Sequence, residues 1–379
     1  MRRSLTVLTA SPTVLAALLT VLTASLTVLA APLTVLAQGR ISNAATETRS
    51  AAQGLEREVR AAAARGGVVW IGYRAPLVAG PRQMCCFDTI SDARACCGVC
   101  RLDGGSGVTM STGDYGSRGD RIALEPPTEF LVLARIEAGA VVRVRTFTPD
   151  CDIDAGGAPV VWFTDVKVDE SIAWLSALAT SAADAGERRE RIAKPALAAV
   201  ALHDVPAADR ALESFVAIIR PESLRSDTTF WLGSTRGEPG VRVLTRMMQQ
   251  DPSDKVRDKA TFGLSVSKAP SALPTLVAAA KSDASPRVRG QALFWLAQKA
   301  GKEAVATIAD AIDRDPETEV KKKAVFALSQ LPKDEGVPKL IEVARTNRNP
   351  EVRKQAMFWL GQSKDPRAVQ FFEDVLLKK

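Results

Sequence analysis

The nine-residue stretch VRGQALFWL at positions 288–296 has four further copies in this chain, each 32 residues from the next. They are LRSDTTFWL at 224–232, VRDKATFGL at 256–264, VKKKAVFAL at 320–328 and VRKQAMFWL at 352–360. Self-similarity at a fixed period of this length is typical of stacked repeats. The stretch therefore predicts a helical solenoid in the second half of the chain. Solenoids of this kind usually bind other macromolecules along an extended surface.

Each period contains the apolar patterns of two helices. In the copy at 288–296, Val288, Ala292 and Leu296 fall on one stripe of a helix with about 3.6 residues per turn. Polar residues suited to a turn or a cap precede the first helix of the last four periods, namely Asp251, Asp283, Asp315 and Asn347. The second helix repeats in the same step, with one apolar column at Leu244, Leu276, Ile308, Leu340 and Phe372. A further helix over 169–181 is expected to cap the upstream end.

The pattern Asp-x₄-Val-Arg-x₂-Ala-x₃-Leu resembles the HEAT-repeat family, in its short form known from phycobilin lyases. The resemblance covers about residues 190–379 and implies a right-handed superhelical solenoid, which we place at 168–379. The family also contains an iron-dependent deoxyhypusine hydroxylase, whose metal site uses repeated His-Glu pairs. The single histidine of this chain, His203, is followed by Asp204, so the resemblance does not extend to that activity. His203 is expected to be a helix-end or core residue.

One column departs from the usual repeat, because every copy has phenylalanine six residues after its first position. The column consists of Phe230, Phe262, Phe294, Phe326 and Phe358. On a helix this position lies well away from the apolar stripe. The rings either wedge between first helices of adjacent repeats or form a partly exposed ladder that binds a partner. In the second interpretation Arg257, Arg289 and Arg353 border the binding face, and the partner is another protein.

The first 37 residues have the pattern of a secretory signal. Arg2 and Arg3 precede a long apolar run built from near-copies of Leu-Thr-Val-Leu, and small residues stand before Gln38. The run is long enough to span a bilayer if it is not cleaved, which leaves a membrane anchor as the alternative. In both cases the rest of the chain is expected outside the cytoplasm, as a periplasmic or secreted protein.

Residues 45–165 predict a small α+β domain. A helix is expected over 45–65 and strands near 68–71 and 159–163. Two further strands, over 130–136 and 141–147, are expected to form a hairpin in an antiparallel sheet. Valines alternate with Arg143 and Arg145 in the second of them, which predicts one buried and one basic face.

Six cysteines are confined to this domain, and an even number in an exported segment predicts a disulfide framework. They are Cys85, Cys86, Cys96, Cys97, Cys100 and Cys151. Their pairing is open. The Cys97-x-x-Cys100 motif leaves a redox dithiol or a metal site as less favoured alternatives. Alternating Asp150, Asp152 and Asp154 resemble half of a calcium loop, but a plain acidic turn is preferred. No cofactor or metal is expected.

The sequence thus predicts a multidomain, exported scaffold that binds a protein without catalysis. An enzyme or redox protein using the cysteines is the alternative. The net charge of +7 resides almost wholly after residue 220 and raises nucleic-acid binding as a third possibility. Export counts against that possibility, so no nucleic acid is expected. Contact with a membrane is expected only through an uncleaved N-terminal segment.

Overall fold

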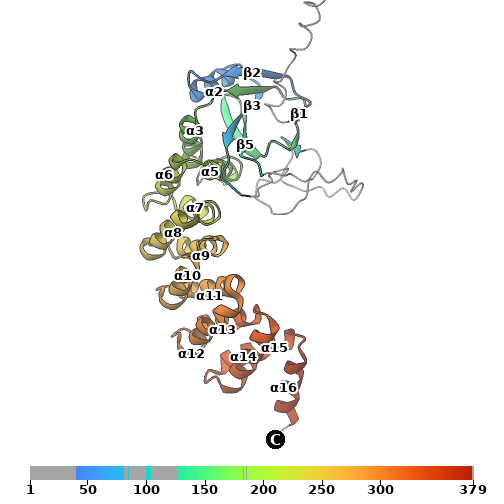
Figure 1. Cartoon of the computed structure of the whole chain (residues 1–379), viewed down its shortest axis with the longest axis vertical. Coiled ribbons are helices and arrows are strands. Elements are labelled where there is room, and N and C mark those ends of the chain that lie inside the picture. Colours follow the sequence, from blue (N-terminus) through green and yellow to red (C-terminus); the bar gives the residue numbers. More distant parts are fainter. Residues whose placement is uncertain are drawn as a thin grey trace, which may run out of the picture.

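The computed structural model describes residues 40–80, 84, 100–103, 126–181, 183–184 and 186–377. A sheet-containing unit lies at the N-terminal end of this part, and layers of paired helices extend from it to the C-terminus (Figure 1). The expected signal segment at 1–37 lies outside the described residues, as do Cys85, Cys86, Cys96 and Cys97. Among the described helices, none is both long and apolar enough to cross a membrane.

The N-terminal unit is built on a five-stranded mixed sheet. Its strand order is β2 (Thr46–Ser50), β8 (Val160–Thr164), β3 (Val68–Pro76), β5 (Glu129–Glu137) and β6 (Ala140–Phe147). Strands β3, β5 and β6 are antiparallel neighbours, as expected, whereas β8 runs parallel to both β2 and β3. The predicted hairpin is confirmed. Ala138 and Gly139 close it with φ angles of 49° and 78°, the left-handed pair that a tight hairpin turn favours.

The helix expected over 45–65 is correct only in its second half. Helix α2 spans Leu55–Ala63, whereas Thr46–Ser50 pairs in parallel with β8 as an edge strand. The Ala-, Glu- and Arg-rich composition favours a helix, but the β-branched Thr46 and Thr48 also suit a strand. Pairing with a neighbouring strand decided the outcome, and Gly54 at φ 119° redirects the chain between the two elements.

A small parallel sheet covers one face of the large one. It has the order β1 (Arg40–Ser42), β7 (Asp152–Asp154) and β4 (Cys100–Arg101). The cluster between the two sheets includes Trp70, Leu133 and Trp162. The basic face expected on β6 lies under this small sheet, and Arg143 Nη1 donates to the carbonyl oxygen of Leu102 at 3.3 Å. Arg145 is only 5% exposed, and its Nη1 donates to the carbonyl oxygen of Arg101 at 2.6 Å.

The opposite face of the large sheet continues into the helical region without a break in the core. Helices α3 (Val168–Ser181) and α5 (Lys194–Leu202) lie against it. A short helix α4 (Gly186–Arg188) and the π-helix η2 (Arg189–Ala193) connect them. One cluster of buried residues runs from Leu55 of α2 through Leu202 to Phe371 near the C-terminus. The N-terminal unit thus caps the upstream end of the solenoid, and the helix expected over 169–181 is confirmed.

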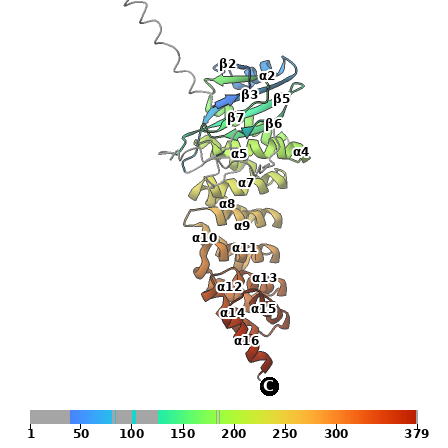
Figure 2. The same cartoon turned by 90° about the vertical axis from the view of Figure 1, so that its right-hand side faces the viewer.

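The predicted solenoid is confirmed as pairs of helices that form successive layers (Figure 2). After α5 and α6 (Pro206–Phe215), the layers are α7 (Glu222–Thr235) with α8 (Gly237–Gln250) and α9 (Asp254–Val266) with α10 (Ala272–Ser282). Next come α11 (Pro286–Ala300) with η3 (Gly301–Ala304) and α12 (Val305–Arg314), then α13 (Thr318–Ser329) with α14 (Lys333–Thr346). The last pair is α15 (Pro350–Gln362) and α16 (Pro366–Leu377). The first helices α7, α9, α11, α13 and α15 contact one another in sequence.

Candidate protein-binding surface

The five phenylalanines of the column lie on these successive first helices, and their rings join into a continuous aromatic ladder. Phe230 stacks on Phe262 with ring centroids 5.8 Å apart, and Phe294 stacks on Phe326 at 5.7 Å. The rings therefore pack between repeats, and four of them also remain half-buried. Binding of a partner by this column stays a prediction. At the C-terminal end Phe358 is 54% exposed.

Tryptophans complete the ladder at every second repeat, an alternation that the sequence analysis missed. Trp295 lies 4.9 Å from Phe262 of the preceding repeat, and Trp359 lies at the same distance from Phe326. Trp231 occupies the corresponding position in the first copy, whereas Gly263 and Ala327 stand there in the repeats between. The signal was present in the sequence as a 64-residue period of Phe-Trp pairs. Stacked and tilted contacts therefore alternate along the ladder.

The column carries exposed apolar area across several layers of a rigid scaffold. Aromatic rings combine a large contact area with few rotatable bonds, which is why they dominate the binding energy of many protein interfaces. Mutual stacking fixes the ladder rings further, so little side-chain entropy is lost when a partner covers them. The arrangement can thus bind an apolar segment of another molecule without rearrangement.

The arginines expected beside this column make a second ladder with aspartates of the following repeat. Arg257 Nε donates to Asp283 at 2.9 Å, and Arg289 Nε donates to Asp315 at 2.7 Å. Arg225 and Asp251 form the same pair one repeat upstream at 2.8 Å. Each guanidinium group also donates to a main-chain carbonyl in its own repeat. These side chains therefore hold adjacent layers together.

Arg353, in the last repeat, donates Nη1 to the carbonyl oxygens of Asn347 and Arg348 at 2.8 and 3.1 Å. A role for Arg257, Arg289 or Arg353 in binding a partner stays a prediction. The turn role expected for the aspartates is confirmed, since Asp283 Oδ1 accepts from the main-chain nitrogen of Ser285 at 2.8 Å.

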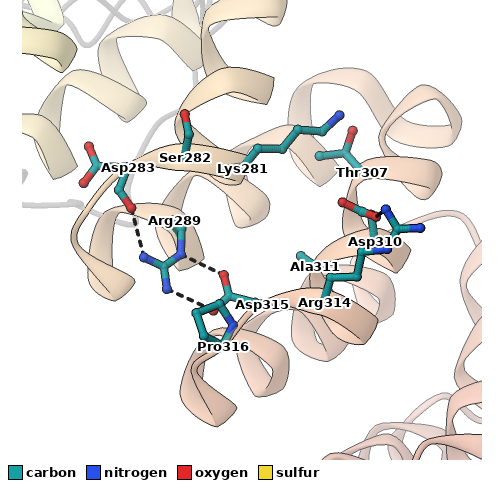
Figure 3. A pocket seen from close by; sticks show the side chains of 11 residues that line it. Lys281, Ser282, Asp283, Arg289, Thr307, Asp310, Ala311, Arg314, Asp315 and Pro316 are labelled. Atoms are coloured by element: carbon teal, nitrogen blue, oxygen red, sulfur yellow. Dashed lines mark hydrogen bonds and ion pairs between the residues drawn. The ribbon is translucent and has the colours of Figure 1, made fainter.

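A surface depression of about 300 Å³ borders the Arg289–Asp315 pair (Figure 3). Its lining carries the cationic Lys281, Arg289 and Arg314 and three aspartates. The guanidinium group of Arg314 lies 3.0 Å from Asp310, and that of Arg289 pairs with Asp315. Because opposite charges neutralise one another here, the depression does not select a ligand by charge.

His203 is a core residue at the end of α5, as the sequence predicted. Its Nδ1 lies 2.7 Å from the carbonyl oxygen of Ala199, which can only accept, so Nδ1 carries the proton. Nε2 then accepts from Ser171 Oγ at 3.0 Å, and Tyr73 donates to the same hydroxyl at 2.8 Å. Burial lowers the pKa of His203 to about 4, which keeps the ring neutral. All three side chains are buried, so this Ser–His contact joins the sheet to the solenoid and is not accessible to substrate.

Cys100 and Cys151 are the two cysteines within the described residues, and they are 2% and 1% exposed in the cluster between the two sheets. No group of three or more potential metal ligands is found in the described part of the chain. The acidic segment expected to be a plain turn is a strand over Asp152–Asp154, namely β7. Asp154 Oδ1 accepts from Gly156 N and from Asn43 Nδ2, both at 2.9 Å. These hydrogen bonds hold the pKa of Asp154 below its ordinary value.

Comparison with known proteins identifies the C-terminal region as HEAT repeats. The HEAT-repeat family model matches residues 241–319, 273–349 and 305–379, so this part of the chain consists of such repeats. No curated protein matches the chain.

Several solved structures are similar to part of this chain. The complex of CpcE and CpcF of phycocyanin lyase from Nostoc sp. PCC7120 is 24% identical with a TM-score of 0.32, over 40% of this chain and 98% of that one. Human deoxyhypusine hydroxylase is 16% identical with a TM-score of 0.28, over 54% and 89% of the two chains. Kap121p bound to Pho4p is 14% identical with a TM-score of 0.36, over 55% and 27%.

Proposed function

We propose that this protein is a non-catalytic scaffold that binds another protein along the aromatic ladder of its solenoid. The observation that carries this proposal is the unbroken row of rings on α7, α9, α11, α13 and α15, which ends in the exposed ring of Phe358. An apolar surface that continues across several layers is typical of an interaction site. The layered scaffold holds it in one geometry, which favours a partner that follows the length of the solenoid.

The test is affinity capture from a cell-envelope extract with the full-length chain as bait. Phe358→Ser removes an exposed ring of the ladder, and Val369→Ser removes a similarly exposed apolar side chain from α16 as a matched control. Neither change opens the core, so the free energy of unfolding of both variants should lie within about 0.5 kcal/mol of that of the wild type. We expect at least a tenfold loss of captured partner for Phe358→Ser alone. Equal capture by the two variants would overturn the proposal.

We further propose that the chain is exported and that its cysteines form disulfides. The pattern of residues 1–37 supports export. The near-complete burial of Cys100 and Cys151 in one cluster supports the second part. Mass spectrometry of the mature N-terminus, with thiol counting on the unreduced, denatured protein, tests both. A start near Gln38 and no free thiol are expected; an intact leader in the cytoplasmic fraction and six free thiols would contradict both.

A further inference from the structure

The 64-residue period relates two similar units of the solenoid. The contacts of a lysine in the upstream unit indicate what the corresponding cavity in the downstream unit can bind. Residues 262–299 correspond to residues 326–363. The two units share the ladder phenylalanine, the tryptophan, a serine near the end of the first helix, and a glutamine three residues after the tryptophan. Among the positions at which they differ is the last, where Lys299 in the upstream unit is replaced by Ser363 in the downstream one.

In the upstream unit the ammonium group of Lys299 occupies the C-terminal end of α9. Its Nζ donates to the carbonyl oxygen of Ser265 at 3.1 Å and to that of Ser267. Carbonyl oxygens at the end of a helix lack intrahelical donors and carry partial negative charge, so they suit a cation. Lys299 lies one turn after Trp295 on α11, so the two side chains share a helix face.

In the downstream unit the corresponding place is an open cavity. It has a volume of about 270 Å³, and its lining includes Ser329, Leu331, Trp359 and Ser363. Ser329 and Leu331 are the counterparts of the two residues whose carbonyl oxygens bind Lys299. Within the described part of the chain, neither of their carbonyl oxygens accepts a hydrogen bond.

We propose that this cavity binds a primary ammonium group on an alkyl chain, supplied by a lysine of the bound partner. The inference deepens the proposed function and rests on it for the source of the lysine. Trp359 connects the two sites, because its ring contacts Phe326 and Phe358 of the ladder and also lines the cavity. A partner that covers the C-terminal end of the ladder is thus positioned to insert a lysine beside the tryptophan.

Lys333 is the competing occupant from within the chain, since it also lines the cavity. Its side chain is exposed, and its charge acts on Asp365, whose pKa is held low chiefly by Arg367. The upstream unit has Ala269 at the equivalent position. Lys333→Ala therefore makes the downstream cavity resemble the upstream one more closely and removes the competing cation.

The experiment titrates the full-length protein with pentylammonium chloride and follows the indole NMR signal of Trp359, with 1-pentanol as the uncharged probe. We expect saturable binding of pentylammonium in roughly the millimolar range, as suits a single small group, and no comparable effect of pentanol. Lys333→Ala should leave binding equal or tighter. Ser363→Lys should weaken it at least tenfold and raise the melting temperature, because the new side chain fills the cavity as Lys299 does upstream.

Lys299→Ser provides the reciprocal test, because it should create a second site that is reported by Trp295. The inference is overturned if neither wild type nor Lys333→Ala binds pentylammonium saturably, if pentanol binds equally well, or if Ser363→Lys leaves binding unchanged. Phe358→Ser separates the two proposals. This variant should retain pentylammonium binding even though it loses the partner. A negative result for ammonium binding in the cavity therefore does not refute partner binding on the aromatic ladder.

Discussion

Asp283→Asn should weaken the contact between two layers of the solenoid by about 2–3 kcal/mol. The carboxylate of Asp283 is 3% exposed and accepts from Arg257 Nε at 2.9 Å and Nη2 at 3.2 Å. Removing one partner of a fully buried pair costs about 3–5 kcal/mol. The cost should be smaller here, because Arg257 retains 13% exposure and its Nη1 still donates to the carbonyl oxygen of Asp251. Asparagine keeps the oxygen that accepts from Ser285, so the change isolates the ion pair.

The chain supplies its own control for this prediction. At one step of the Arg–Asp ladder, Lys321 stands in place of the arginine and Asn347 in place of the aspartate. Lys321 Nζ donates to the carbonyl oxygen of Asp313 at 2.7 Å. The double variant Arg257→Lys/Asp283→Asn copies that arrangement. We expect it to lose at least about 1 kcal/mol less than the sum of the single changes, since paired neighbours are coupled.

Urea unfolding followed by far-ultraviolet circular dichroism measures these free energies for the wild type, both single variants and the double variant. A loss below about 0.5 kcal/mol for Asp283→Asn would refute the structural role of the pair, because surface changes without such a role stay within that range. Strict additivity of the two single changes would refute the coupling.

Three other outcomes follow from the structure. His203 has a folded-state pKa of about 4 against an ordinary 6.5, so unfolding takes up protons between these values. The free energy of unfolding should have its full value above pH 6.5 and fall by up to about 3 kcal/mol toward pH 4. His203→Gln should flatten this part of a plot of the urea midpoint against pH. A Cβ on Gly233 would lie 1.9 Å from a main-chain oxygen of α9, whereas one on Gly361, the equivalent residue of the last repeat, meets nothing within 4 Å. Gly233→Ala should therefore lower the melting temperature, while Gly361→Ala should raise stability by about 0.5–1 kcal/mol. Phe294→Ser and Phe326→Ser should each cost about 2–4 kcal/mol in urea unfolding because their rings pack between repeats; unchanged stability would contradict that packing.

The helical half of the fold was predictable because its information is local and repeated. Each period shows the same apolar stripe, so a residue that departs from the pattern in one copy does not obscure it in the others. The N-terminal unit offers no such repetition. Thr46–Ser50 became a strand because β8 lies beside it, and Arg145 is buried because β4 covers β6. Both outcomes depend on contacts distant in the sequence, which composition and alternation do not reveal.

The candidate surface was predictable in part. The phenylalanine column and its position away from the apolar stripe were visible in the sequence, but its partial burial was not, since that depends on the separation of adjacent layers. The Arg–Asp ladder could have been found, because Arg257 and Asp283 recur together at 32-residue steps and change together to Lys321 and Asn347. The ammonium cavity required the structure, which shows where the side chain of Lys299 ends.

The central claim is that a partner protein lies on the aromatic ladder. Photo-crosslinking in intact cells tests it most directly, with a benzophenone amino acid placed at position 358 on the ladder or at position 369 on α16. The account predicts a specific crosslinked partner from position 358 and none from position 369. Crosslinks from position 369 alone, or from neither position while the partner still co-purifies, would contradict it.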